Sequence, residues 1–373
     1  MGILPAMAFN LPITLQRQGK GSPGLGAGSL SADLQGILSV LQISRQAGGS
    51  MYDFIGDIHG HAERLIALLE AMGYRETETG YSHPARKAFF IGDLIDRGPS
   101  QVATLKIVKA MVESGAALMV LGNHEYNAVA WATPHPDQPG EFLRNHGDRN
   151  RHQHQAFLDQ VGEGSALHQE MIAWFKTLPV FIETTEFRAI HACWHSAYID
   201  AARPFLDANN AILPEAWPML SEKDTEPYHI IETLLKGTEV DLPEGITYFD
   251  PDGNERNRTR TRWWDEQATT YRSSGMVAKS VEHQLPDTPI PGKNLLTYDQ
   301  RKLLLFGHYW MTGAPQALNA HMACLDYSIG KGTPGTKLCA YRWQGERQIL
   351  QDGFVWVDAV KPAKHLDIGE VTP

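Results

Sequence analysis

Cysteine is scarce in this chain, and it contains no long apolar runs. The 373 residues include three cysteines, Cys193, Cys324 and Cys339, and neither their odd count nor their spacing suggests pairing. This pattern disfavours a disulfide framework and is typical of a protein kept in a reducing cytosol, so we expect a cytoplasmic location. The sequence predicts no membrane span, because it has no run of about 18 apolar residues.

An excess of positive charge is also absent. The chain has 43 Asp and Glu against 33 Lys and Arg, which gives a formal net charge of −10. General nucleic-acid binding is therefore not expected, because the phosphate backbone repels an acidic surface. The length and the apolar content of 42 % allow a sizeable core in one or two domains.

The two ends of the chain differ from its centre. Residues 19–28 are rich in Gly and are typical of a flexible linker, and a clear strand begins only at Met51. We therefore expect residues 1–50 to be a disordered or loosely docked tail, with Met51 as an alternative initiator. A regulatory or partner-binding arm is the other interpretation. A single domain is expected over residues 51–360, followed by a C-terminal tail over 361–373.

Polar residues follow three predicted strands, at residues 51–55, 88–91 and 117–121. Each strand ends near a glycine that precedes polar side chains, in Gly56-Asp57-Ile58-His59-Gly60, Gly92-Asp93-Leu94-Ile95-Asp96-Arg97 and Gly122-Asn123-His124-Glu125. Apolar residues at helical spacing follow the first two of these segments. Because ligand sites in α/β sheets form at the carboxyl ends of strands, we expect these side chains to lie together.

Two later histidines complete the pattern. His191 ends a predicted strand at 187–191, and His308 follows one at 303–306. The combined set offers carboxylate, imidazole and amide groups and no thiolate, which suits Mn, Fe, Zn or Ni and disfavours Cu(I). A carboxylate shared by two metals ~3.5–4 Å apart has the geometry for in-line attack on phosphorus.

These segments resemble the phosphoprotein phosphatase branch of the calcineurin-like metallophosphoesterases. That branch includes Ser/Thr protein phosphatases and symmetrical bis(5′-nucleosyl)-tetraphosphatases. The resemblance is dense over residues 53–125, and residues 324–332 (CLDYSIGKG) are similar to the family's closing strand-and-glycine segment. It implies an α/β (α+β) fold of two packed β-sheets flanked by helices. It also implies an insertion at about 192–300 over the active site.

The resemblance further implies which residues bind metal. Two divalent ions are expected, Mn²⁺ first, with Fe, Zn and Ni as alternatives. The first metal would be held by Asp57, His59 and Asp93. The second would be held by Asp93, Asn123, His191 and His308. His195 is a rival to His191, because Ala192 stands where the family usually has Gly.

Three further roles follow from the same resemblance. His124 is expected to be the general acid for the leaving oxygen, oriented by Asp96. Arg97 is expected to clamp the phosphate, for which a planar bidentate donor is well suited. Substrate contacts are also expected from Arg260 or Arg262, because the family's second phosphate-binding arginine lies between its last two histidines.

Four arginines alternate with Asn and Thr from Arg256 to Arg262. In a strand, all four would share one face. One interpretation is an anion-binding wall over the metals. The other is a solvated edge strand whose charges block aggregation.

Several residues near the motifs have simpler interpretations. His152 and His154 lie in a polar, charged run and are expected in a solvated loop. Cys193 is expected to be a small buried hydrophobe, and Trp263 and Trp264 are expected in the core.

The activity expected first is hydrolysis of a phosphate monoester by metal-activated water, as in Ser/Thr protein phosphatases. Symmetrical dinucleoside tetraphosphate hydrolysis is the alternative, because the arginine run suits a polyphosphate chain. A nucleic-acid end phosphatase or a 2′,3′-cyclic phosphodiesterase comes third. An inactive phosphate-binding module is an alternative of another class, which the intact motifs disfavour. The expected partner is a phosphorylated substrate, whether a phosphoprotein, a nucleotide or a small ester.

Overall fold

The computed structural model describes residues 51–250, 253–292 and 296–360. The tails predicted over 1–50 and 361–373 lie outside the described residues. Within the described part of the chain, no helix combines the length and the apolar character needed to span a bilayer.

The larger sheet contains the first three predicted strands. Its hydrogen-bonded order is β14-β15-β1-β4-β5, with β16 paired to the other side of β15. The strands are β1 (Met51–Ile55), β4 (Arg86–Phe90), β5 (Ala117–Met119), β14 (Asp326–Tyr327), β15 (Lys337–Trp343) and β16 (Phe354–Asp358). Strands β1, β4 and β5 run parallel, so their carboxyl ends meet at one edge of the sheet.

The smaller sheet supplies the other predicted strand ends. Its order is β13-β12-β7-β6, and β12 runs parallel to both neighbours, β7 and β13. The strands are β6 (Phe181–Glu183), β7 (Phe187–Ile190), β12 (Leu303–Phe306) and β13 (Met322–Cys324). His191 and His308 therefore leave this sheet on the same side, just past β7 and β12.

Alternate residues along the strands point to opposite faces of each sheet, and this explains why the two sheets pack against each other. Tyr52 and Phe54 of β1 belong to the same buried cluster as Leu303 and Leu305 of β12, whereas the residues between them face the other way. The ring centroids of Phe54 and Phe187 are 5.0 Å apart across the interface. The predicted pair of packed sheets flanked by helices is confirmed.

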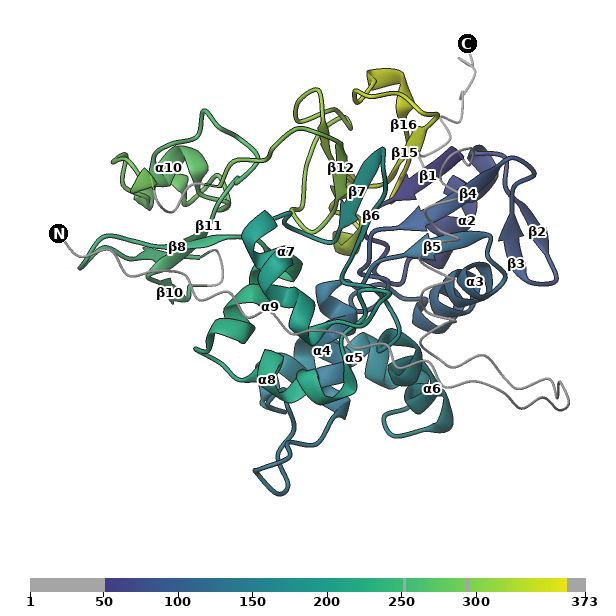
Figure 1. The fold of residues 1–373 in the computed structure, drawn as a ribbon, viewed down its shortest axis with the longest axis horizontal. Coiled ribbons are helices and arrows are strands. Elements are labelled where there is room, and N and C mark those ends of the chain that lie inside the picture. The colour runs from purple at the N-terminus through teal and green to yellow at the C-terminus, as the bar shows by residue number, and fades with distance from the viewer. Residues whose placement is uncertain (1–50, 251–252, 293–295, 361–373) are drawn as a thin grey trace, which may run out of the picture.

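Helices cover the sheets from outside. Helices α2 and α3 lie beside β1, β4 and β5, while α7, α8 and α9 lie on the side of β7 (Figure 1). The helices are α2 (Ala62–Ala71), α3 (Gln101–Glu113), α4 (Asn123–Ala132), α5 (Asp148–Val161), α6 (Ala166–Phe175), α7 (Ser196–Ala202), α8 (Trp217–Ser221), α9 (Glu226–Lys236) and α10 (Tyr271–Ser274).

The segment between the last two histidines combines buried and projecting parts. Trp263 and Trp264 are buried, with ring centroids 5.2 and 5.5 Å from Phe306, so the core prediction for them is confirmed. The short pairs β8 (Glu239–Asp241) with β11 (Arg258–Arg260) and β9 (Tyr248–Phe249) with β10 (Glu255–Arg256) project to one side together with α10 (Figure 1). A further hairpin joins β2 (Arg75–Thr77) to β3 (Gly80–Ser82).

Residues 148–161 form helix α5, so the solvated loop predicted around His154 is wrong. His154, Phe157, Leu158 and Val161 are buried on one side of this helix, while His152 is exposed. These four positions have the spacing of one helical face. The surrounding charges and amides belong to the opposite, solvated face, which concealed the periodicity.

Candidate metal centre and active site

The loops after five strands place polar side chains around one point. Asp57 follows β1, Asp93 follows β4, Asn123 begins α4 after β5, and His191 and His308 follow β7 and β12. All five residues are buried. The sequence places them 251 positions apart at the extremes, and the parallel strands bring them together.

Asp93 lies at the centre of this cluster. Its Oδ2 lies 3.7 Å from His59 Nε2 and 3.8 Å from His124 Nε2, and its Oδ1 lies 3.4 Å from His191 Nε2. Two groups therefore share this carboxylate: His59, Asp93 and His124, and Asp93, His191 and His308. Within each group the ligand atoms lie within 4.8 Å of one another. An acidic residue that faces both groups is suited to bridge two cations.

The remaining predicted ligands border the same cluster. Asp57 Oδ2 lies 4.0 Å from His59 Nε2, and both Asp57 oxygens accept a hydrogen bond from the His308 backbone N–H at 3.2 Å. Asn123 Oδ1 lies 3.1 Å from His191 Nε2. The structure thus brings all six predicted ligands together. His124, predicted as an acid, also reaches the first group.

The histidines are oriented as metal ligands would be. His59 Nδ1 donates to the carbonyl of Ile95, and His191 Nδ1 donates to that of Ile91, each at 2.8 Å. These bonds turn each Nε2 toward Asp93, as outer partners do for ligating imidazoles. His308 Nε2 is buried and has no hydrogen-bond partner among the described residues. Such an atom is costly unless a ligand takes its lone pair, so the residues fit divalent cations.

The electrostatics of the centre favour metal-binding protonation states. Burial and the neighbouring His124 lower the pKa of His59 to about 3. Burial, with Arg260, lowers the pKa of His308 well below its ordinary value. Burial alone would raise the pKa of Asp93, but His191 and His124 hold it well below the usual range. Two neutral imidazoles therefore face a carboxylate, which is the donor set that a divalent cation needs.

His191 and Asp57 depart from that pattern. Burial would lower the pKa of His191, but Asp93 raises it to about 10. Burial and the nearby Asp326 raise the pKa of Asp57 well above its ordinary value. His191 therefore holds a proton that a bound cation would displace.

Several residues here adopt a backbone conformation that side chains rarely take. The positive φ values are 47° at His59, 52° at Asp93, 70° at Asp96, 72° at Arg97 and 75° at His308. Non-glycine residues in this region are uncommon and concentrate at functional sites.

The glycine before His308, Gly307, allows the backbone to lie close to the Asp57 carboxylate. A Cβ added to Gly307 would lie 2.1 Å from Asp57 Oδ1, so a side chain there would collide with the carboxylate.

The predicted acid and its partner form a short pair. His124 Nδ1 lies 2.5 Å from Asp96 Oδ2, and its Nε2 faces Asp93. Burial would raise the pKa of Asp96, but His154 and His124 together lower it below the usual range. An ionised Asp96 accepts the Nδ1–H of His124, which directs Nε2 toward the centre. Arg97 lies beside them with its guanidinium 4.3 Å from the Trp310 ring centroid.

Glu125 organises the motifs and was not assigned a role from the sequence. Its carboxylate accepts from the backbone N–H groups of Asp93 at 2.9 Å, Leu94 at 2.8 Å and Gly122 at 3.1 Å. Burial and the charge of Asp93 raise its pKa to about 7. The signal was present, because an acidic residue in the first turn of a helix is a capping pattern. Glu125 thereby ties the second motif to the third.

His195 does not compete with His191. Its Nδ1 accepts from the backbone N–H of Tyr198 at 3.3 Å at the start of α7, and the two rings stack with centroids 4.1 Å apart. Cys193 is buried, as predicted, and burial raises the pKa of its thiol well above the ordinary value.

The four arginines from Arg256 to Arg262 do not form one wall. Strand β10 ends at Arg256 and β11 begins at Arg258, and each pairs with a different strand. Arg256 pairs with Asp250 at 2.8 Å, and Arg258 pairs with Asp241 at 2.5 Å.

The last two arginines of the run lie in different surroundings. Arg262 donates to the Ser273 carbonyl at 3.0 Å and lines a separate cavity of about 110 Å³, so it is not near the metal ligands. Arg260 lines the pocket that contains His308, and its Nε lies 3.5 Å from Glu239 Oε1. The prediction of a shared arginine face is wrong because the strand breaks at Asn257.

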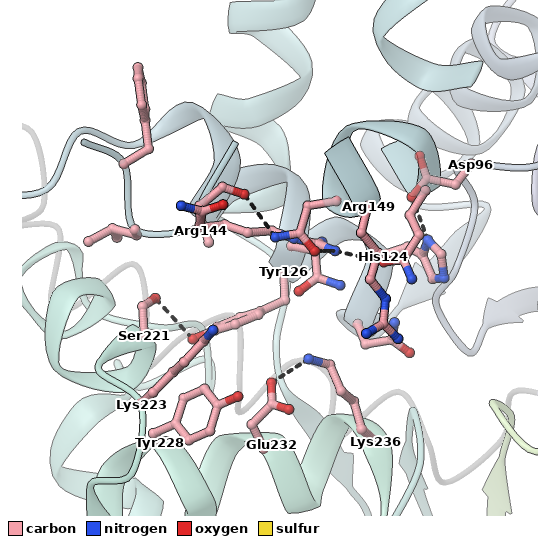
Figure 2. Close-up of a pocket in the computed structure, with 18 of the residues that line it drawn as sticks. Asp96, His124, Tyr126, Arg144, Arg149, Ser221, Lys223, Tyr228, Glu232 and Lys236 are labelled. Carbon is pink, nitrogen blue, oxygen red and sulfur yellow. Dashed lines mark hydrogen bonds and ion pairs between the residues drawn. The ribbon is translucent and has the colours of Figure 1, made fainter. Parts of the chain in front are cut away.

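A pocket of about 620 Å³ opens beside the metal ligands. Its basic lining comes from several elements: Arg97, Arg144, Arg149, Lys223, Lys236 and Arg260. Its aromatic lining is Tyr126, Phe142, Tyr228 and Trp310. Figure 2 shows the His124–Asp96 pair on one side of the pocket and Lys223 with Tyr228 on the other. Residues from the insertion expected at about 192–300 thus line the space next to His124.

Three comparisons place the chain among known proteins. The asymmetrical bis(5′-nucleosyl)-tetraphosphatase PrpE of Halalkalibacterium halodurans is 40 % identical over 74 residues, which is 20 % of this chain and 30 % of that protein. A symmetrical bis(5′-nucleosyl)-tetraphosphatase of Psychromonas ingrahamii is 28 % identical over 317 residues, covering 79 % of this chain and 94 % of that protein. A solved structure of a protein serine/threonine phosphatase from Saccharomyces cerevisiae covers 88 % of this chain and 90 % of its own, with 15 % identity and a TM-score of 0.43.

The model of one protein family covers the whole region that carries the motifs. It is described as calcineurin-like phosphoesterase, and it matches residues 52–308, from β1 to the last predicted metal ligand. This chain therefore belongs to the calcineurin-like phosphoesterase family.

Proposed function

We propose that the enzyme cleaves a P–O bond with water activated at a dinuclear metal site. Two bound cations would supply a water of lowered pKa and neutralise phosphate oxygens. The residues that would hold them are Asp57, His59, Asp93, Asn123, His191 and His308. The bridging position of Asp93 and the orphaned Nε2 of His308 support this assignment.

We assign proton donation to His124. Asp96 accepts its Nδ1–H, so Nε2 can carry the proton that the leaving oxygen needs. Arg97 binds the phosphate, and its contact with Trp310 holds the guanidinium at the pocket wall. His124→Ala should keep metal and slow turnover by roughly 10²–10⁴, with a smaller loss for esters that have good leaving groups. Equal losses for nitrophenyl and alkyl esters would remove the acid role.

For the substrate, we propose a dinucleoside tetraphosphate cleaved symmetrically. The observation that carries this is the basic pocket continuous with the metal ligands. A phosphomonoester, which the sequence favoured first, would engage the metals and Arg97 but leave Arg144, Arg149 and Lys223 without a phosphate. Tyr228 and the other aromatic side chains offer faces on which a base can pack. The long alignment with a symmetrical tetraphosphatase supports the same class.

A substrate panel with Mn²⁺ tests this proposal. Diadenosine tetraphosphate should have a higher kcat/KM than p-nitrophenyl phosphate, its bis ester and a phosphopeptide, and the product should be ADP alone. Equal amounts of ATP and AMP would mean asymmetrical cleavage. A higher kcat/KM for a phosphomonoester would contradict the tetraphosphatase proposal and favour a protein-phosphatase-like activity.

Substitutions in the pocket distinguish a tetraphosphatase from a phosphomonoesterase independently of the substrate panel. Arg149→Ala and Lys223→Ala should raise KM for the tetraphosphate, with a marked salt dependence, and leave p-nitrophenyl phosphate hydrolysis unchanged. Arg258→Ala is the matched control, because this arginine is paired with Asp241 and does not line the pocket. If the pocket variants behave like the control on every substrate, the pocket does not bind the polyphosphate.

A further inference from the structure

Asp96 is held on both of its carboxylate oxygens by histidines. His124 Nδ1 contacts Oδ2 at 2.5 Å, and His154 Nδ1 contacts Oδ1 at 2.8 Å. The backbone N–H of Asp96 donates to Gln101 Oε1 at 2.8 Å. Asp96 is buried and has a φ of 70°. The contact from His154 is therefore a second restraint on the carboxylate that orients the acid.

The second histidine comes from an element with no part in the sequence motifs. His154 lies on α5, and its side chain is 1 % exposed. Its ring packs between Trp131, with centroids 5.9 Å apart, and Phe157, with centroids 4.9 Å apart. Its Nε2 is buried and has no hydrogen-bond partner among the described residues. Since Nδ1 faces a carboxylate oxygen, which can only accept, Nδ1–H is the donor in this contact.

Packing alone does not account for a histidine at this position. The surrounding face of α5 is apolar, with Phe157, Leu158 and Val161 buried next to it. A leucine would fill such a site without leaving a nitrogen atom unsatisfied. Among the described residues, the one hydrogen-bond partner of the His154 side chain is Asp96.

We propose that His154 is a positioning residue for the reaction, holding the Asp96 carboxylate so that its other oxygen fixes the tautomer and orientation of His124. This inference rests on the proposed acid role of His124. His154 is not itself one of the residues that line the pocket, and it acts through Asp96, which is. The group that it supplies is a single N–H donor at the Nδ1 position.

The chemistry of the donor gives a sharp test. The amide nitrogen of Asn lies as many bonds from Cα as Nδ1 of His, whereas the amide of Gln lies one bond further. His154→Asn should therefore retain most of the activity, and His154→Gln and His154→Leu should lose it. We expect a loss of about 10- to 100-fold in kcat on phenyl phosphate with little change in KM, the usual cost of removing an outer-shell partner. The loss should shrink on p-nitrophenyl phosphate, whose leaving group needs less protonation.

His168 supplies the matched control. It is buried on α6 with its ring 5.7 Å from that of Phe157, it also has an Nε2 without a partner among the described residues, and it makes no contact with Asp96. His168→Leu should lower the thermal stability of the protein without any leaving-group dependence of kcat. Metal content and thermal unfolding are measured for every variant, and the comparison of Asn with Gln avoids reliance on the apolar variant.

Each outcome decides a different question. If His154→Asn and His154→Gln lose activity equally, or if their losses ignore the leaving group while His124→Ala shows the dependence, His154 only packs and the inference fails. If His124→Ala itself shows no such dependence, the proposed acid role fails first. Rescue by Asn alone, with the same leaving-group pattern as His124→Ala, supports positioning.

Discussion

Metal binding should release a proton from His191, and the contacts of its imidazole explain why. His191 Nδ1 donates to Ile91, while Nε2 faces both Asn123 Oδ1 at 3.1 Å and Asp93 Oδ1 at 3.4 Å. Oxygen acceptors on both nitrogens stabilise the imidazolium, and Asp93 raises its pKa to about 10 against the opposing effect of burial. A cation that takes Nε2 must displace this proton.

The size of the effect follows from that pKa. At pH 8.5 the metal-free protein holds the His191 proton almost completely, so loading with Mn²⁺ should release at least one proton per chain. His59, with a pKa lowered to about 3, should contribute none. Below about pH 10 the apparent Kd for the second metal should rise about tenfold for each unit that the pH falls, or about 1.4 kcal/mol.

The assay is isothermal titration calorimetry of the chelator-treated protein in two buffers with different ionisation enthalpies. The difference in observed heat gives the number of protons released. The sign of the stability change provides a second readout. The raised pKa stabilises the metal-free fold fully below the unfolded pKa of 6.5, and this contribution is lost as the pH rises through about 10. Binding with no proton release at pH 8.5 would refute the His191–Asp93 ion pair.

Three substitutions test other parts of the site. Gly307→Ala places a Cβ 2.1 Å from Asp57 Oδ1, so it should abolish metal binding or folding, as elemental analysis and circular dichroism will report. Glu125→Ala leaves three buried backbone N–H groups without an acceptor and should lower the free energy of unfolding by at least about 3 kcal/mol in urea titrations. Arg260→Ala should raise KM for a polyphosphate substrate, whereas Arg258→Ala should not; equal effects would contradict the placement of Arg260 in the pocket.

The cluster of proposed metal ligands could be predicted because these residues are local to strand ends. Asp57, Asp93 and Asn123 each come within a few residues of a parallel strand, and a glycine precedes each of them. Period-two alternation and the chain direction are sufficient to bring such residues to one edge. The two later histidines follow the same rule in the second sheet. The distances within the cluster and the raised pKa of His191 depend on contacts between side chains, which the spacing of residues in the sequence does not predict.

The pocket could not be predicted for a physical reason. Arg144, Arg149 and Lys223 lie in charged or polar stretches that in a sequence look the same as any solvated surface. Whether such a charge faces water or a ligand depends on how the elements around α4, α8 and α9 meet, which is a tertiary contact. The prediction for the arginine run was wrong for a different reason. The alternation of arginines suggested a single strand. Instead β10 ends at Arg256 and β11 begins at Arg258, because the two halves of the run pair with different strands.

The proposed metal ligands, which could be predicted, and the basic pocket residues, which could not, should respond differently to substitution. The proposed ligands follow strand ends of two sheets packed through aromatic side chains, so their positions are fixed by the core. The basic residues sit on helices, loops and the short strand β11 outside those two sheets, and none is predicted to touch a metal. Substitutions in the pocket should therefore alter KM and substrate preference while leaving metal content intact. His154 lies between these classes, because it is buried like a core residue yet acts on the reacting centre through Asp96. A variant at this position that changed KM and left kcat intact would place it with the pocket, and would show that α5 contributes to binding rather than to proton transfer.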